Sequence, residues 1–201
     1  GTLHNNTSGD SSTAVGFETL YSNTSGESNT AIGSLALYKN TTGGLNVASG
    51  VYALYSNTTG SGNVAIGHGS LFSNTTGIYN VGCGAFALQN NTTGVNIAVG
   101  KEALAANTTG SNNIAVGINS MSKNLTGWWN AAIGSFSLYN NTTGYYNSTL
   151  GYRSLYSNTT GEYNTAAGFQ SAENNTSGVK NTSLGAESLA SNTNGDNNTA
   201  I

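Results

Sequence analysis

A glycine recurs at a nearly constant interval along the whole chain, and this period constrains the fold more than any other feature. The interval is 17 residues everywhere except between Gly94 and Gly110, where it is 16. A chain that repeats at a short fixed period folds into stacked copies of one small unit, none of which buries a core alone. We therefore predict a single repeat array over residues 1–201, and we expect it to be part of a longer fibrous protein.

Each recurring glycine closes an Asn-Thr-Thr-Gly motif or a close variant of it. Because Asn and Gly tolerate positive φ angles, we interpret this motif as a tight corner that occurs once per repeat. Representative corner residues are Asn57, Gly60, Asn74, Gly77, Asn91 and Gly94.

Two short segments between the corners have the features of β-strands. The first has the form Asn-x-Ala-x-Gly, as in 63–67, where small and β-branched residues alternate with a period of two. The second ends in a small residue followed by Leu, as at Ala53 and Leu54. With no helical period, this pattern predicts an all-β fold: a parallel β-solenoid, or β-roll, of about 11–12 coils. At about 4.8 Å per coil, the rod would be on the order of 55 Å long.

An asparagine recurs at the start of the first segment. In a stack of coils these side chains would lie above one another, and their amides could form hydrogen bonds from coil to coil. The residues are Asn29, Asn46, Asn63, Asn80, Asn96 and Asn113.

The composition argues against two classes of partner. Charged residues make up 6% of the chain and the net charge is −3, so no basic patch is available to neutralise nucleic-acid phosphates. No apolar run approaches the roughly 18 to 20 residues that a membrane-spanning helix needs. We expect neither nucleic-acid binding nor membrane insertion.

The ionisable residues are too scattered for catalysis. Glu18, Glu102 and Glu187 share one column of the repeat, but Glu18 and Glu102 are five coils apart. That separation is roughly 24 Å, whereas paired catalytic carboxylates lie within about 5 to 10 Å. The two histidines, His4 and His68, are also coils apart, and a zinc site needs three or four converging ligands. We predict no catalytic, cofactor or metal site, and no enzymatic activity.

Two groups of aromatic residues vary between repeats and are the candidates for contacts. The column after Leu predicts either stacking between coils or a seam between subunits, because aromatic residues are common anchors of buried interfaces. Its members are Tyr21, Tyr38, Tyr55, Phe72, Tyr139 and Tyr156. A second group follows the corner glycines, in loops that tolerate variation, and is our candidate for ligand or surface contact; loop-on-loop packing is the alternative. Its members are Trp128, Trp129, Tyr145, Tyr146 and Tyr163.

The repeat unit resembles the head repeats of YadA-type trimeric autotransporter adhesins. The resemblance rests on residues 29–36, with the sequence Asn-Thr-Ala-Ile-Gly-Ser-Leu-Ala. The longer form, which adds Leu37, Tyr38 and the corner 40–43, is similar to repeats of tail-fibre-like proteins. The resemblance implies a parallel β-roll, a homotrimer, a cell-surface or virion location, and attachment to cells, glycans or matrix. This chain has about three more residues per repeat than the adhesin heads, around the corner.

These features together predict a structural and adhesive segment of an extracellular fibre. A self-assembling filament subunit without its own receptor site is the alternative, and concentration-dependent fibres rather than discrete rods would favour it. An ice-binding solenoid is a third possibility, suggested by the threonine stripe Thr41, Thr58, Thr75 and Thr92. Each of these threonines is followed by a second threonine within the turn. Threonines that form one flat ice-binding face would instead alternate along a strand, so the pattern argues against this function.

Overall fold

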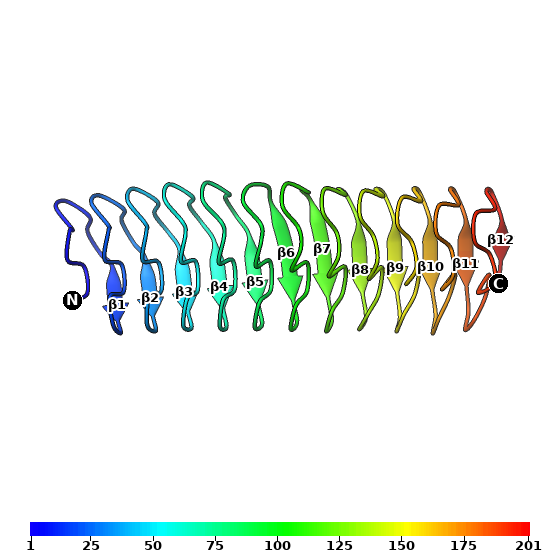
Figure 1. Ribbon diagram of the computed structural model, residues 1–201, viewed down its shortest axis with the longest axis horizontal. Helices are drawn as coiled ribbons and strands as arrows, with labels where there is room; N and C mark the ends of the chain where they lie inside the picture. The colour runs from blue at the N-terminus through cyan, green and yellow to red at the C-terminus, as the bar shows by residue number, and fades with distance from the viewer.

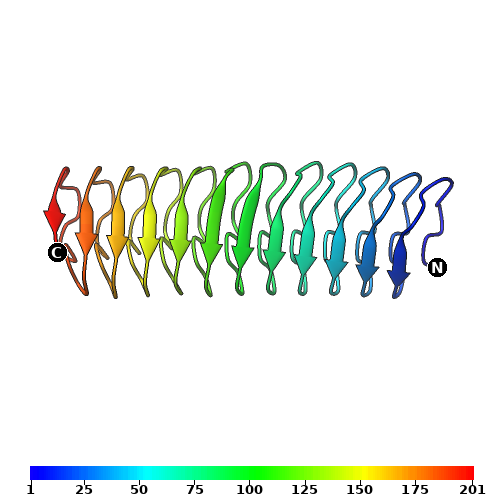
Figure 2. The same cartoon turned by 180° about the vertical axis from the view of Figure 1, so that it is seen from behind.

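The computed structural model describes residues 1–201 and is a rod of stacked coils with the termini at opposite ends (Figure 1). Each strand belongs to a single 12-stranded parallel sheet whose order follows the sequence. Figure 2 shows the same even stacking from behind. The predicted all-β parallel solenoid is thus confirmed. No helix in the structure is long and apolar enough to cross a membrane.

The strands are short and occupy the first of the two predicted segments. They are β1 Thr13–Val15, β2 Thr30–Ile32, β3 Val47–Ser49, β4 Val64–Ile66, β5 Val81–Cys83, β6 Asn96–Val99, β7 Asn113–Val116, β8 Ala131–Ile133, β9 Ser148–Leu150, β10 Thr165–Ala167, β11 Thr182–Leu184 and β12 Thr199–Ala200.

The register places equivalent residues of successive coils directly above one another. Ala48 pairs with Ala65, and Ala65 pairs with Gly82. The alanine column points inward and is buried, whereas the alternating aliphatic column, represented by Ile66, points outward and stays exposed. The strand period of two therefore separates an inner column from an outer one in every coil.

The second predicted strand does not form, and this prediction was wrong. Tyr52 and Leu54 both have left-handed backbone angles, with φ of 59° and 51°. Left-handed residues bend a chain that a strand would extend, so the segment curls back toward the axis of the rod. Its backbone still bonds from coil to coil, for example from Leu37 N to Ala53 O at 3.0 Å. The curl turns the leucine side chain into the interior, where Leu54 is fully buried.

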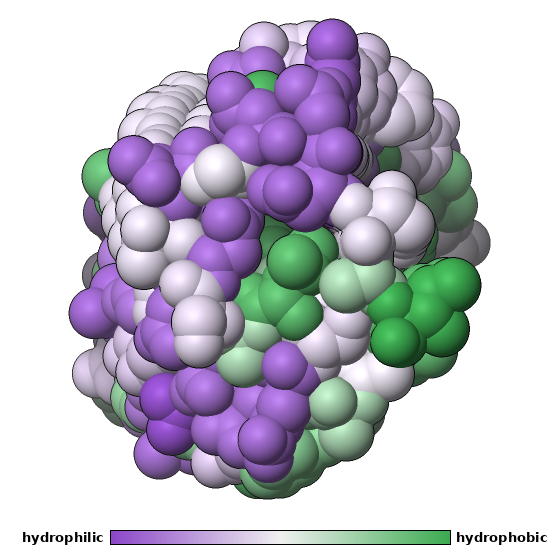
Figure 3. All heavy atoms as spheres, turned by 90° about the vertical axis from the view of Figure 1, so that its right-hand side faces the viewer, coloured by the Kyte–Doolittle hydropathy of each residue, from purple (hydrophilic) through white to green (hydrophobic).

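The core is a thin column of leucine and alanine side chains that runs the length of the rod. A single cluster of 21 buried residues contains almost all of them, with Met121 and Ala172 in place of leucine in two coils. Seen end-on from its C-terminal end, the rod shows apolar residues in the middle and at one side, with polar residues above and below them (Figure 3). The burial of each leucine requires the coils on either side of it.

The corner asparagines form a continuous ladder of buried amides. Asn57 is typical: its Nδ2 donates to Asn40 Oδ1 at 2.8 Å and to Gly60 O at 2.9 Å. Its Oδ1 in turn accepts a hydrogen bond from Asn74 Nδ2 at 3.0 Å. Links of this kind join every corner from Asn6 to Asn192.

The corner glycines are needed for a different reason from the one we expected. Gly60 does not have a positive φ, and among the corner glycines only Gly94 does, at 96°. A Cβ atom on Gly60 would instead collide with the Gly77 carbonyl oxygen of the next coil and with Asn57 Oδ1. The absence of a side chain allows the coils to stack closely enough for the amide ladder to form.

The expected ladder of strand asparagines is also present, inside the rod. Asn63 Nδ2 donates to Asn46 Oδ1 at 3.1 Å and to Gly77 O at 2.8 Å. The Asn63 backbone N–H also donates to Asn46 Oδ1, at 2.9 Å. This second ladder ties the start of each strand to the corner of the following coil.

The 16-residue interval is accommodated by local changes in both ladders. Asn96 Nδ2 donates to Asn91 Oδ1 at 3.2 Å and so joins the two ladders within one coil. Asn91 Nδ2 reaches Asn74 Oδ1 at a longer 3.4 Å, and the positive φ of Gly94 absorbs the missing residue. The strand ladder loses its side-chain link here and keeps the bond from the Asn96 backbone N–H to Asn80 Oδ1, at 2.8 Å. The corner ladder remains continuous, so the short coil interrupts the repeat without interrupting the rod.

We predict that Asn107→Ala lowers the free energy of unfolding by about 3 kcal/mol, because it leaves buried partners unpaired. Asn107 Nδ2 donates to Asn91 Oδ1 at 2.8 Å and to Gly110 O at 2.9 Å, and Asn107 Oδ1 accepts from Asn124 at 2.8 Å. Asn90→Ala removes an exposed amide and is the matched control, with an expected change within about 0.5 kcal/mol. Urea unfolding followed by circular dichroism measures both. Equal effects of the two substitutions would contradict a stabilising role for the ladder.

Candidate functional site

The five aromatic residues predicted for surface contact form one continuous cluster. They lie on three successive coils, in the loops between corner and strand. Trp128 stacks on Tyr145 with ring centroids 5.0 Å apart, and Tyr146 stacks on Tyr163 at 5.1 Å. Trp129 lies over Tyr146 at 6.4 Å. The predicted alternative of packing between loops is therefore observed, but four of the five side chains also remain exposed, Tyr145 being half-buried.

Glu162 is the only acidic residue that modifies this cluster electrostatically. The hydrogen bond between the Tyr145 hydroxyl and the Glu162 carboxylate, followed by partial desolvation of the phenol and by the charge of that carboxylate, raises the pKa of Tyr145 to about 12. The neutral phenol is therefore maintained at all physiological pH values. The cluster presents an uncharged aromatic surface with a single carboxylate next to it.

The aromatic column after Leu is stacked between coils of the same chain. Successive rings from Tyr21 to Phe72 have centroids 5.4, 5.4 and 5.1 Å apart, and Tyr139 stacks on Tyr156 at 5.3 Å. His4 extends the column, 4.8 Å from Tyr21, a position that the sequence reasoning missed. Desolvation, followed by the nearby Glu18 carboxylate, raises the pKa of Tyr38.

Basic side chains cover part of this stacked column. Lys39 lies 5.0 Å from the Tyr55 ring centroid, Lys123 lies 4.9 Å from that of Tyr139, and Arg153 lies 4.3 Å from that of Tyr156. Arg153 also pairs with Glu173 at 2.7 Å. Stacking and cation contacts thus occupy much of the ring surface, and the observed geometry is the intercoil alternative of the two that we considered.

A row of exposed aliphatic side chains lies on the outer side of the sheet. We name this the aliphatic row; Val15 is 57% exposed, Ile66 44% and Leu150 56%. Its exposed members are Val15, Ile32, Ile66, Val99, Ile133, Leu150 and Leu184. The sequence pattern identified the column but not its exposure.

A second feature that the sequence reasoning missed lies at the short coil. Regular coils have two residues between the corner glycine and the strand asparagine. The second of these is Tyr79 in the coil before the short coil, Asn112 in the coil after it, and Trp129 one coil further on. The short coil has only Val95 there. The missing side chain leaves a hollow of about 310 Å³, which we name the short-coil notch. It is lined chiefly by Tyr79, Val95, Ile97, Asn112, Ile114 and Trp129. The 16-residue interval was the signal that could have revealed it.

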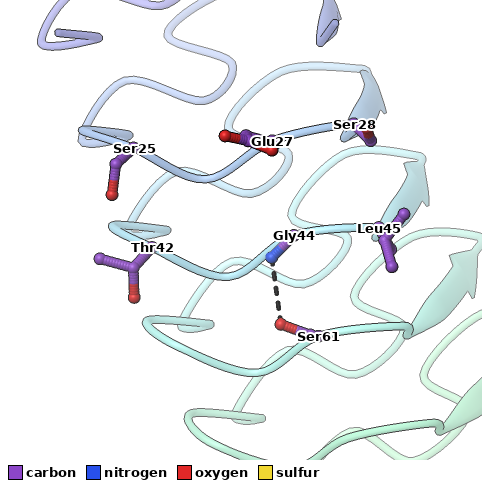
Figure 4. A pocket seen from close by; sticks show the side chains of 7 residues that line it. All are labelled: Ser25, Glu27, Ser28, Thr42, Gly44, Leu45 and Ser61. Carbon is purple, nitrogen blue, oxygen red and sulfur yellow. Dashed lines mark hydrogen bonds between the residues drawn. The ribbon is translucent and has the colours of Figure 1, made fainter. Parts of the chain in front are cut away.

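A polar hollow of about 370 Å³ lies near the N-terminal end of the rod (Figure 4). It forms where Gly44 has no side chain between Glu27 and Ser61 of the adjacent coils. The Gly44 N–H donates to Ser61 Oγ at 3.1 Å, so part of its polar lining is already satisfied. Glu27 is its only charged residue.

The ionisable side chains are distributed over separate coils. Glu18, Glu102 and Glu187 occupy equivalent positions and do not converge, and no group of three or more His, Cys, Asp or Glu side chains is gathered in a metal-binding arrangement. The only cysteine, Cys83, is unpaired and half-buried on β5. The arrangement offers binding surfaces rather than paired acid–base groups.

No protein-family model, curated protein or solved structure matches this chain. The similarity to adhesin head repeats therefore rests on the repeat motif alone and stays a prediction.

We predict that Glu162→Gln lowers the pKa of Tyr145 from about 12 toward its ordinary value of 10.0, because it removes the carboxylate that accepts the hydrogen bond of the neutral phenol and repels the phenolate. In the native protein the raised pKa favours folding fully below pH 10 and loses this contribution as the pH rises from 10 toward 12. The measurement is an NMR titration of ring-labelled tyrosine. Glu27→Gln, at the equivalent position of a distant coil, is the control and should leave the Tyr145 titration unchanged. An unaltered pKa in Glu162→Gln would contradict the assigned cause.

Proposed function

We propose that this chain is a segment of an extracellular attachment fibre, on a cell surface or a virion, that acts as a stiff rod without catalytic activity. The observation that carries the proposal is the unbroken stacking of all coils by two buried amide ladders. A rod of 12 strands spaced about 4.8 Å apart extends on the order of 53 Å, and the corner ladder joins every pair of successive coils along it. Continuous hydrogen bonding resists bending. A stiff rod suits a fibre segment that holds an attachment region at a distance from the cell surface or virion.

Self-association is part of this proposal. The aliphatic row exposes a large side chain on most coils, and apolar side chains exposed in a continuous row are characteristic of interaction sites. Since the row repeats with the spacing of the coils, a second copy of the chain is the partner that matches it along its whole length. A homotrimer is the assembly that the adhesin resemblance implies. In this assembly the aliphatic row makes the contact between subunits, and the stacked aromatic column stabilises the fold of each subunit.

The threonine hydroxyls argue against the ice-binding alternative. Thr41 Oγ1 donates to Thr58 O at 3.0 Å, and Thr58 Oγ1 donates to Thr75 O at 3.1 Å. Hydroxyls that bond to the next coil are not free to form a regular array toward ordered water. The threonine stripe is thus explained by the stability of the rod.

We predict a sedimentation-equilibrium mass of three times 20.4 kDa, about 61 kDa, for the native chain. The double variant Ile66→Lys and Ile133→Lys places charges in the aliphatic row and should give the monomer mass. Thr76→Lys with Thr143→Lys, two exposed corner positions, adds the same charge and should keep the native mass. Circular dichroism checks that each variant is folded. A native monomer would remove the trimer, and concentration-dependent fibres would favour the filament alternative.

The attachment role predicts that beads coated with the chain are retained on surfaces bearing glycans or matrix proteins. Trp128→Ala with Tyr146→Ala should reduce the retention, because these residues lie at the centre of the exposed aromatic cluster. Tyr52→Ala, which removes an exposed ring outside the cluster, is the control. Equal retention of all three proteins would remove the aromatic cluster from the attachment surface.

A further inference from the structure

We propose that the short-coil notch binds one or two rings of a neutral saccharide. The proposal deepens the attachment role and rests on it for its biological setting, but the binding event can be measured independently of it.

The notch owes its shape to the one-residue deletion. In regular coils the residue before the strand asparagine bonds back to the preceding coil, as Tyr79 N does to Ser61 O at 3.1 Å. The short coil lacks that residue, and the Ile78 carbonyl instead accepts Asn80 Nδ2 at 3.3 Å. The backbone is therefore satisfied without the missing residue, and the space of its side chain stays open.

One aromatic residue lies at each end of the notch: Tyr79 in the coil before the short coil, and Trp129 in the second coil after it, beyond Asn112. Tyr79 leans over Gly62 on its far side, where a Cβ atom would collide with the ring, and is 65% exposed. Trp129 has its stacking partner Tyr146 on the side away from the notch and is 52% exposed. Neither ring has an aromatic neighbour toward the notch. Open aromatic surfaces of this kind suit the C–H face of a pyranose ring, which is apolar although its edge carries hydroxyls.

The lining matches an uncharged ligand with a polar edge. Val95, Ile97 and Ile114 supply the apolar floor, and the lining contains no charged residue. An ionic ligand would lose hydration there without gaining an ion pair. Three lining residues, Tyr79, Asn112 and Trp129, carry a hydroxyl, a carboxamide and an indole N–H, which are groups that bond to sugar hydroxyls. Its volume of about 310 Å³ is at the lower end of the range of small-molecule pockets, roughly 300 to 1,000 Å³.

The test is a titration of the isotope-labelled chain with cellotetraose, maltotetraose and N-acetylchitotetraose, each to about 10 mM, because contacts of this size bind in the millimolar range. The readout is the pair of indole N–H signals from Trp128 and Trp129. We expect saturable shifts of the Trp129 signal with at least one of the three sugars. No saturable shift with any of them overturns the proposal.

Variants distinguish the notch from the neighbouring aromatic cluster. Tyr79→Ala should weaken binding about tenfold, the loss of one aromatic contact. Insertion of a serine between Val95 and Asn96 restores the 17-residue spacing, fills the notch and should abolish the shift of the Trp129 signal. Tyr163→Ala removes a ring of the same column outside the notch and should bind as the native chain does. Equal loss in Tyr163→Ala, or undiminished binding after the insertion, overturns the assignment to the notch.

Sedimentation distinguishes saccharide binding from the alternative, in which a second copy of the chain occupies the notch. If the insertion lowers the assembly state of the chain, the notch is a contact between copies and the saccharide assignment is wrong. If the chain forms rods that attach to surfaces but no sugar shifts Trp129, only the notch proposal fails. If sugars bind but rods do not attach, the attachment role fails and the notch proposal stands.

Discussion

The rod depends on carboxamides that are buried between coils and bonded on both sides. A carboxamide can donate to one neighbour and accept from another, so a column of asparagines can extend without limit. Asn57 shows the arrangement, bonded to Asn40 on one side and Asn74 on the other. A buried amide left without partners costs about 1–3 kcal/mol, so each coil is held in the register that its neighbours dictate. The ladders thus fix both the spacing and the alignment of every other column.

This constraint separates positions that cannot vary from positions that can. Inside the rod, the asparagine, alanine and leucine columns are nearly uniform, because every member packs against its equivalents above and below. Outside it, one position can hold Trp128, Ile78 or Ser61 without disturbing the backbone. The aromatic cluster, the polar hollow and the short-coil notch all lie in these variable loops. A repetitive scaffold can therefore carry local, non-repetitive surfaces, including one produced by a deletion.

Much of the fold could be predicted because a strict period determines which residues occupy equivalent positions in successive coils. The strands, the parallel pairing, the asparagine ladder and the grouping of Trp128 with Tyr145 followed from counting alone. The second strand was predicted wrongly because Leu54 lies in an apolar, strand-like context, and nothing local reveals its left-handed backbone. The corner glycines were recognised, but Gly60 is required by its close approach to the next coil, which a single repeat does not contain.

The sequence by itself determined the periodicity, the number of coils and the identity of the residues in each column. Only the tertiary structure decided which columns face the interior of the rod, because that depends on how each coil closes in three dimensions. Ile66 and Ala65 are neighbours in one strand, yet one is exposed and the other buried. The short coil shows the same division: its missing residue is visible in the sequence, but only the tertiary structure gathers Tyr79, Val95, Asn112 and Trp129 from four successive coils around one notch.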